Sequence, residues 1–192
     1  TGAELIHPYD DARVIAGQGT AALELVEQAG PFDALIAPVS GGGLLSGTAI
    51  ATHGLDPGVR VLGGEPAQAA DAHASLRRGA LVTDIIPDTI ADGLRAQLCA
   101  RTYAILRAHA VEVLLAGEDG IVAAMRLVWD RLKLVVEPSG AVALAALIAG
   151  REGVAGLRIG VILSGGNVDL DRLPWQEPRF QRGLPPAAGG IA

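Results

Sequence analysis

The segment from Ser40 to Gly47 reads Ser-Gly-Gly-Gly-Leu-Leu-Ser-Gly, directly after an apolar run at residues 34–39 and before a stretch with a helical pattern. Glycines let backbone N–H groups approach a ligand closely, and the N-terminus of a helix carries partial positive charge. A strand, a glycine turn and a helix start in this order predict an anion site. A phosphate group is the natural ligand of such a site.

A second glycine-rich loop, from Ser164 to Asn167, follows the apolar run at residues 157–163. Ligands of parallel α/β sheets bind beyond the carboxyl ends of the strands, so two such loops can meet on one ligand. A single loop of this kind is also an ordinary turn. The two loops together therefore point to a site more strongly than either one alone.

Two nucleotide-binding motifs fit this pattern less well. A nucleoside triphosphate loop needs a lysine where this chain has Thr48. For a dinucleotide loop, Gly41 and Gly43 supply two glycines, Ser46 replaces the third, and Glu65 ends the next strand at the position of the acidic residue. A non-catalytic module that binds a phosphate or a dinucleotide stays open as an alternative.

Composition restricts the partners that this chain can have. Of its 192 residues, 50% are hydrophobic and 19% charged, and the net charge of −6 comes without a basic stripe. Such a charge argues against a nucleic-acid partner. The longest apolar run, residues 141–149, is shorter than the roughly 20 residues that span a bilayer, which argues against a membrane partner. The single cysteine, Cys99, and the absence of a signal-like start predict a reduced, cytoplasmic setting.

Short apolar runs alternate with helical patterns along the chain. We expect strands at Leu5 and Ile6 and at residues 34–39, 59–62, 111–115 and 157–163. We expect helices at residues 21–29 with Thr20 as N-cap, from the glycine turn to Gly54, before Gly79, at residues 118–135, and at residues 139–149. This order predicts an α/β fold with a mostly parallel sheet flanked by helices. Residues 174–192 lack periodicity and are predicted to form a flexible tail after a domain at residues 1–173.

The chain resembles the fold-type II pyridoxal-phosphate (PLP) enzymes of the threonine/serine dehydratase and serine racemase group. The segments that carry the resemblance, in matching order, are His-Pro-Tyr-Asp-Asp at 7–11, Ala-Gly-Gln-Gly-Thr at 16–20, Pro-Val-Ser-Gly-Gly-Gly-Leu at 38–44, Gly-Glu-Pro at 64–66, Thr-Ile-Ala-Asp-Gly at 89–93, Val-Glu-Pro-Ser-Gly-Ala at 136–141 and Leu-Ser-Gly-Gly-Asn at 163–167. The resemblance covers the second half of a family member. It implies that residues 1–173 are a partial PLP-binding catalytic domain that lacks its first half.

The resemblance also implies a set of cofactor-binding residues. The loop around the cofactor phosphate falls on Ser40, Gly41, Gly42, Gly43 and Leu44, the serine that bonds the pyridine nitrogen falls on Ser164, and Gly93 lies beside the ring. Ser40 departs from the usual glycine. Its N–H and its hydroxyl are both candidate donors, provided that its φ is an allowed one.

A divalent cation is implied at Glu65, the carbonyl of Ala69 and Asp71, by resemblance to the metal-activated members of the group. Ligation by oxygen alone favours Mg²⁺, Ca²⁺ or Mn²⁺ over zinc. From the residues themselves, a different interpretation is open. Glu65 then caps the helix that begins near Pro66, and Asp71 is a solvated helix residue.

Other reactive side chains are given structural roles. We read the four histidines as structural or surface groups and Cys99 as a small packed residue, while Glu137 either faces the cofactor or begins a helix. Lys133 is the only lysine, and it matches a family helix remote from the covalent attachment of the cofactor. No residue of this chain is therefore assigned a catalytic role.

The resemblance implies dehydration of L-threonine or L-serine to a 2-keto acid and ammonia, by an intact enzyme that is a homodimer or homotetramer. The partner is a small hydroxy amino acid. This chain is expected to be inactive by itself. Serine racemase and hydroxyaspartate dehydratase activities are the alternatives within the group, because dehydration and racemisation both begin with removal of the α-proton.

Overall fold

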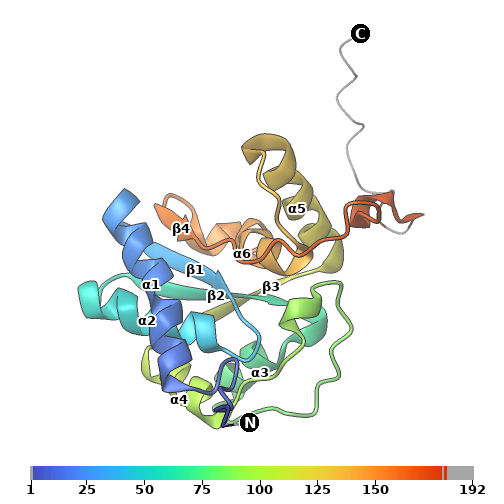
Figure 1. Ribbon diagram of the computed structural model, residues 1–192. Coiled ribbons are helices and arrows are strands. Elements are labelled where there is room, and N and C mark those ends of the chain that lie inside the picture. The colour runs from blue at the N-terminus through green and yellow to red at the C-terminus, as the bar shows by residue number, and fades with distance from the viewer. Residues whose placement is uncertain (1, 179, 181–192) are drawn as a thin grey trace.

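The computed structural model describes residues 2–178 and 180 (Figure 1). Its centre is a four-stranded sheet in the order β3-β2-β1-β4, and every pair of neighbouring strands is parallel. The strands are β1 (Ala34–Pro38), β2 (Arg60–Pro66), β3 (Glu112–Ala116) and β4 (Ile159–Val161). The predicted α/β class with a parallel sheet is confirmed.

Helices cover both faces of this sheet. They are α1 (Ala12–Ala29), α2 (Gly43–Leu55), α3 (Asp71–Arg78), α4 (Ala100–Ala108), α5 (Glu118–Leu132) and α6 (Pro138–Ala149), with short 3-10 helices at Ala67–Ala69, Asp92–Leu94, Arg151–Val154 and Pro174–Gln176. Figure 1 shows α2, α3 and α4 on one side of the sheet and α5 and α6 on the other. Among the described residues, no helix combines the length and the apolar character that crossing a membrane would require.

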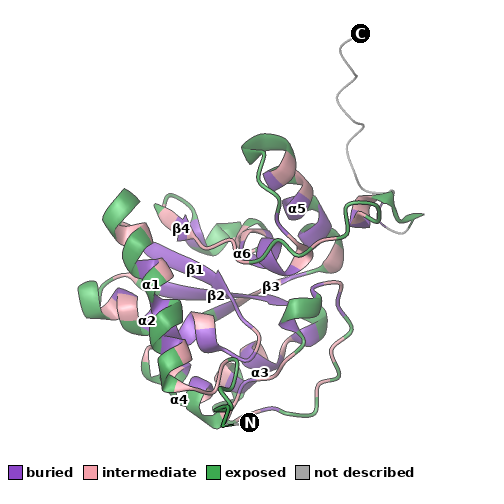
Figure 2. Ribbon diagram, viewed as in Figure 1, coloured by how far each residue is buried: buried purple, intermediate pink, exposed green. Residues whose placement is uncertain are grey.

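Alternate side chains of the strands pack on opposite faces of the sheet, as the pleat requires. Ile36 of β1 packs with Leu62 and with Ala143 of α6. Its neighbour Ala37 packs with Leu45 of α2 on the other face. Because both faces are covered, the central strands β1 and β2 are buried almost throughout, whereas the edge strands β3 and β4 are buried only in part (Figure 2). This explains why the strand sequences are continuous apolar runs.

The strand register brings four loops to one edge of the sheet. Pro38, the last residue of β1, pairs with Gly64 of β2, and Ile36 pairs with Val161, the last residue of β4. The last residue of β2, Pro66, pairs with Ala116, the last residue of β3. The carboxyl ends of all four strands, and the loops that follow them, therefore lie side by side.

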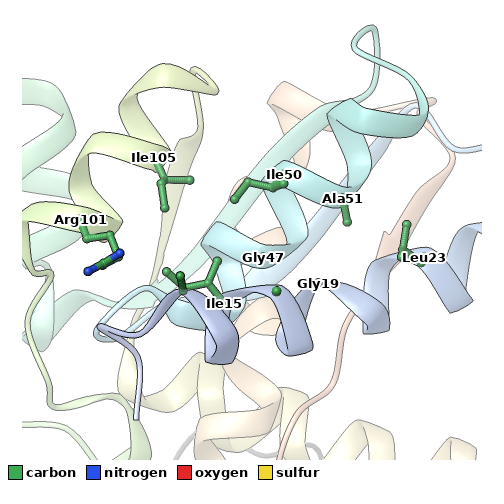
Figure 3. A pocket seen from close by; sticks show the side chains of 10 residues that line it. Ile15, Gly19, Leu23, Gly47, Ile50, Ala51, Arg101 and Ile105 are labelled. Atoms are coloured by element: carbon green, nitrogen blue, oxygen red, sulfur yellow. The ribbon is translucent and has the colours of Figure 1, made fainter. Parts of the chain in front are cut away.

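Helix α1 packs closely on α2. A Cβ atom at Gly19 would lie 2.7 Å from the carbonyl oxygen of Gly47, so both helices need a small residue at this contact. Between α1, α2 and α4 lies an apolar groove of about 370 Å³, with Arg101 at one end (Figure 3). Arg101 Nε donates a 2.7 Å hydrogen bond to Asp10.

The predicted start of the first helix at Thr20 is wrong. Helix α1 begins at Ala12, and the Asp11 side chain caps it by accepting a 2.8 Å hydrogen bond from the Arg13 N–H. Thr20 lies inside the helix, where its hydroxyl donates to the Gly17 carbonyl at 2.8 Å. Gly19, just before Thr20, is part of the helix and serves its contact with α2.

Two other element boundaries also differ from the prediction. Leu5 and Ile6 are 93% and 51% exposed and belong to no strand, since nothing among the described residues pairs with them. Helix α5 ends at Leu132 because Lys133 takes a left-handed conformation with φ 57°. The sequence predicted that this helix would continue to residue 135. Instead, the chain leaves the helix, and the indole N–H of Trp129 donates to the Val136 carbonyl at 2.9 Å.

The segment predicted as a tail begins with packed residues. Pro174–Gln176 forms a short 3-10 helix, and Trp175 lies edge-on to Trp129 of α5, with the ring centroids 5.3 Å apart. Residues 179 and 181–192 of the predicted tail lie outside the described residues. The flexible tail stays a prediction for those residues.

A histidine pair joins the far ends of α2 and α4. The Nδ1 atoms of His53 and His109 are 2.8 Å apart, and His53 Nε2 is 3.0 Å from the Val59 carbonyl oxygen. Because a carbonyl only accepts, His53 carries a proton on Nε2, and one further proton lies between the two Nδ1 atoms. Burial, and then the charge of His53, lowers the pKa of His109.

We expect this pair to make stability depend on pH. The folded-state pKa of His109 lies below its ordinary value of 6.5, so the stabilisation is present above that value and is lost as the pH falls through the folded-state pKa. The urea midpoint of the chain should therefore fall more between about pH 7 and pH 5 than that of His109→Asn, which cannot take up a second proton. Equal falls in both proteins would contradict this role.

Candidate active site

The glycine loop after β1 forms the start of α2. Gly42 is the N-cap residue with φ +89°, and the first helical hydrogen bond runs from the Ser46 N–H to the Gly42 carbonyl at 2.8 Å. No side chain of the described residues caps this helix start. The N–H groups of the first turn are thus available to an anion, as the sequence predicted for the loop and for Leu44.

Tyr9 lies on this loop and accounts for two of its glycines. A Cβ atom at Gly41 would overlap the Tyr9 ring, and one at Gly43 would lie 2.9 Å from Tyr9 Cβ. Tyr9 is held by a turn in which His7 Nδ1 accepts a hydrogen bond from the Asp10 N–H at 3.0 Å. The structural role predicted for His7 is confirmed. The sequence contained Tyr9 within a recognised motif but gave no sign of this contact.

The other side of the loop packs against α4 and the residues before it. A Cβ atom at Gly42 would lie 2.7 Å from Leu98 Cδ2 and 2.8 Å from Thr102 Cβ. The buried Thr102 hydroxyl donates to the Gly41 carbonyl at 2.8 Å. Cys99 begins α4, with its Sγ 3.4 Å from Thr102 Oγ1. Thr102 thus fixes the loop, although nothing in its sequence context indicated so.

Ser40 has no positive φ, so the serine fits the loop without backbone strain. Its hydroxyl donates to the Ala96 carbonyl at 3.1 Å and accepts from the Ala96 N–H at 3.0 Å. The sequence left both the N–H and the hydroxyl of Ser40 as candidate phosphate donors. In the structure the hydroxyl proton is used within the protein, and the backbone N–H is the donor that remains.

The second glycine loop follows β4 and packs on the start of α6. A Cβ atom at Gly140 would overlap the Ser164 carbonyl oxygen, so the loop and the helix touch. The Ser164 side chain is half-buried, and its hydroxyl makes no hydrogen bond to any described residue. It is therefore free to bind a ligand atom.

Glu137 ties this loop to the segment that contains Gly93. Its Oε2 accepts a 2.6 Å hydrogen bond from the Asn167 N–H. Its Oε1 occupies the place that a Cβ atom on Gly165 would take. Gly93 donates its N–H to Ser139 Oγ at 3.0 Å, and a Cβ atom on Gly93 would lie 3.6 Å from Glu137 Oε1. Glu137 is the N-cap residue of α6, so it begins a helix, as one of the two sequence interpretations expected.

The candidate cation ligands lie at the same edge of the sheet, at the end of β2 and just after it. Glu65 is 1% exposed and accepts hydrogen bonds from the N–H groups of Ala72 at 2.8 Å and His73 at 2.9 Å. Asp71 is 3% exposed, and its Oδ2 accepts from the Leu98 N–H at 2.9 Å. Glu65 does bond N–H groups at a helix start, but the helix is α3, which begins at Asp71 and not near Pro66 as predicted. The interpretation of Asp71 as a solvated residue is wrong. Ala69 lies between them as the buried residue of a 3-10 turn.

Burial dominates the electrostatics of these two carboxyl groups. It raises the pKa of Glu65 to about 8, with the Asp71 charge as a smaller cause, and it raises the pKa of Asp71 to about 6. Neither group takes part in an ion pair among the described residues. Buried carboxylates without a cationic partner are costly, so this site favours either protons or a bound cation.

Lys133 lies at the far end of α5, where its side chain is 77% exposed and contacts Asp130. The chain has no other lysine, and none therefore lies at the site. His, Cys, Asp and Glu side chains of the described residues form no group of three or more that could hold a metal. A cation at the Glu65 site would need backbone oxygen or water as further ligands.

We expect Gly42→Ala to destabilise the chain strongly. The left-handed conformation costs a non-glycine residue about 1–2 kcal/mol, and the contacts with Leu98 and Thr102 add to this cost. The matched control is Gly54→Ala in the same helix, where a Cβ atom meets open space and raises helix propensity by about 1 kcal/mol. Urea unfolding should show opposite signs for the two substitutions. A neutral Gly42→Ala would show that the loop does not need its left-handed glycine.

Comparison with known proteins agrees with this geometry. Residues 1–165 match the family model described as pyridoxal-phosphate dependent enzyme. The chain is 49% identical over 175 residues to the beta-hydroxyaspartate dehydratase of Paracoccus denitrificans, covering 91% of this chain and 56% of that protein. The chain spans about half the length of the curated relatives it matches.

Solved structures give the same result. Maize serine racemase superposes with a TM-score of 0.85 at 44% identity, over 92% of this chain and 55% of that one. The T.th. threonine deaminase superposes with a TM-score of 0.81 at 47% identity, over 88% of this chain and 64% of that one. The fold, the two glycine loops and the family match agree, and the chain belongs to the pyridoxal-phosphate dependent enzymes of fold type II.

Proposed function

We propose that this chain is the cofactor-binding part of a PLP-dependent enzyme that removes water from a small 3-hydroxy amino acid, giving a 2-keto acid and ammonia. The observation that carries this proposal is the pair of loops at one edge of the sheet. One offers the uncapped N–H groups of α2, and the other offers the free Ser164 hydroxyl. The similarity to a hydroxyaspartate dehydratase and a threonine deaminase supports a hydroxy amino acid as the substrate.

The residues present fit the cofactor at two points. The N–H groups from Ser40 to Leu44 would hold the phosphate, and Ser164 would hydrogen-bond the pyridine nitrogen. When bound, PLP supplies an electron sink that allows the Cα–H bond of an amino acid to break. A hydroxyl partner, rather than a carboxylate, leaves the ring nitrogen less protonated and suits β-elimination. Gly93, whose N–H is held by Ser139, would lie beside the ring.

Racemisation of serine is the second candidate, favoured by the similarity to maize serine racemase. Both reactions begin with removal of the α-proton. The site contains no lysine that could remove it, because the only lysine of the chain, Lys133, is exposed and contacts Asp130. The dinucleotide alternative is disfavoured, because Glu65 is buried and bonded to backbone N–H groups instead of being available to a ribose.

A titration of the chain with PLP tests the cofactor proposal. Absorbance and fluorescence should show saturable binding. Borohydride should trap no covalent adduct at the site, because the only lysine, Lys133, has an exposed side chain that contacts Asp130. Ser164→Ala should weaken binding by about 0.5–1.5 kcal/mol, roughly 2- to 12-fold, through loss of one hydrogen bond. Thr20→Ala, which removes an exposed hydroxyl of α1, should bind as the unchanged chain does. Binding of NAD without binding of PLP would refute the proposal.

We further propose that Glu65, the Ala69 carbonyl and Asp71 hold a divalent cation such as Mg²⁺, Mn²⁺ or Ca²⁺. Two buried carboxyl groups without an ion-pair partner support this proposal, and oxygen ligands suit these ions. The Leu98 N–H occupies only one of the two Asp71 oxygens, and the other can contact a cation.

The melting temperature of the chain should rise with the concentration of the cation that binds. Stabilisation of this kind amounts to about 2.7 kcal/mol at one hundred times the dissociation constant. Asp71→Asn keeps an acceptor for the Leu98 N–H and should abolish the response. Asp84→Asn, at an exposed position, should retain it. An equal response of both variants to the ion would exclude this site.

A further inference from the structure

The segment from Thr89 to Leu98 forms one wall of the candidate site and has little regular structure of its own. It contains only a 3-10 turn at Asp92–Leu94. Side chains from elsewhere in the fold hold its backbone. Glu118 accepts from the Ile90 N–H at 2.8 Å, and Ser139 from the Gly93 N–H at 3.0 Å. The position of Gly93 therefore depends on such anchors.

Ser40 is the anchor that comes from the glycine loop itself. Its hydroxyl bonds both the N–H and the carbonyl of Ala96, a residue 56 positions along the chain, at 3.0 and 3.1 Å. A single hydroxyl has one proton to donate, and the Ala96 carbonyl takes it. The bonds are partly buried, which protects them from competition by water.

The same segment also touches the glycine loop beside this anchor. Leu98 fills the space next to Gly42, where a Cβ atom would lie 2.7 Å from Leu98 Cδ2. The Leu98 N–H is held in turn by Asp71 at 2.9 Å. Ser40 and Leu98 thus connect the loop proposed to bind the phosphate with the segment proposed to lie beside the ring. Loss of the Ser40 hydroxyl would release this connection at Ala96 and leave two polar backbone groups without partners.

We propose that Ser40 is a positioning residue: its hydroxyl fastens the segment from Thr89 to Leu98 to the glycine loop and so fixes Gly93 before the cofactor binds. Only the Ser40 N–H serves the phosphate. This inference rests on the proposed function, because that proposal identifies the ligand. The contact between Ser40 and Ala96 is independent of the ligand.

Two ligands separate this role from a direct phosphate contact. Pyridoxal has the ring of PLP without its phosphate. If the Ser40 hydroxyl bound the phosphate, Ser40→Ala would weaken PLP and leave pyridoxal unchanged. If Ser40 positions the wall beside the ring, the substitution should weaken both ligands by a similar factor, about 3- to 10-fold for the loss of a hydrogen-bonded anchor.

Hydrogen exchange of the ligand-free chain provides the second measurement. Ser40→Ala should lower the protection of the amides from Gly93 to Leu98 by about 10-fold, because this region opens locally once its anchor is lost. Ser40→Thr keeps a hydroxyl and should restore both the protection and the affinities. The matched control is Ser75→Ala, which removes a buried serine that accepts from the Val82 N–H at 2.9 Å. It should leave the exchange of residues 93–98 and both affinities unchanged.

Reduced protection together with equal weakening of PLP and pyridoxal would support the proposal. Weakening of PLP alone, with unchanged protection, would overturn it in favour of a phosphate ligand. Reduced protection with unchanged affinities would also overturn it, because the anchor would then not serve the site. Failure of the unsubstituted chain to bind PLP would instead refute the proposed function, and this result is distinct from any effect of Ser40.

Discussion

The parallel register of the sheet is the constraint on which the candidate site depends. Because β1 pairs in parallel with both β2 and β4, the loops after these strands must open at the same edge. The glycine loop, the acidic pair and the Ser164 loop belong to segments that are far apart in the sequence. Their proximity follows from backbone hydrogen bonding within the sheet. Each loop then presents its polar groups through its own residues and their backbone conformation.

The glycine loop shows how packing and binding can make the same demand on a residue. Gly42 has a left-handed conformation, and its side-chain position is filled by Leu98 and Thr102. Gly41 leaves room for the Tyr9 ring. The loop is thus held tightly from both sides while its N–H groups stay without side-chain partners. A binding loop that is already ordered loses little conformational entropy when a ligand arrives.

The buried carboxyl groups of Glu65 and Asp71 are the part of this site that costs stability. Both are bonded to backbone N–H groups, yet burial still raises their pKa values. Asp71 also holds Leu98, which packs on the glycine loop. The acidic pair and the glycine loop are therefore linked through Leu98. A shift in the position of Asp71 would change how Leu98 packs against the loop.

The sequence by itself determined the α/β class, the two glycine loops and the family, because these depend on local runs of residues and on their order. It failed where a residue acts through a distant partner. Thr20 was predicted as a cap, but it lies inside α1, whose Gly19 packs on Gly47 of another helix. Leu5 and Ile6 were predicted as a strand, although no neighbouring strand exists for them among the described residues. Only the tertiary structure decided that the Ser40 hydroxyl belongs to Ala96, that Tyr9 covers the loop and that Asp71 is buried. Each of these contacts joins residues far apart in the chain, and no local pattern encodes them.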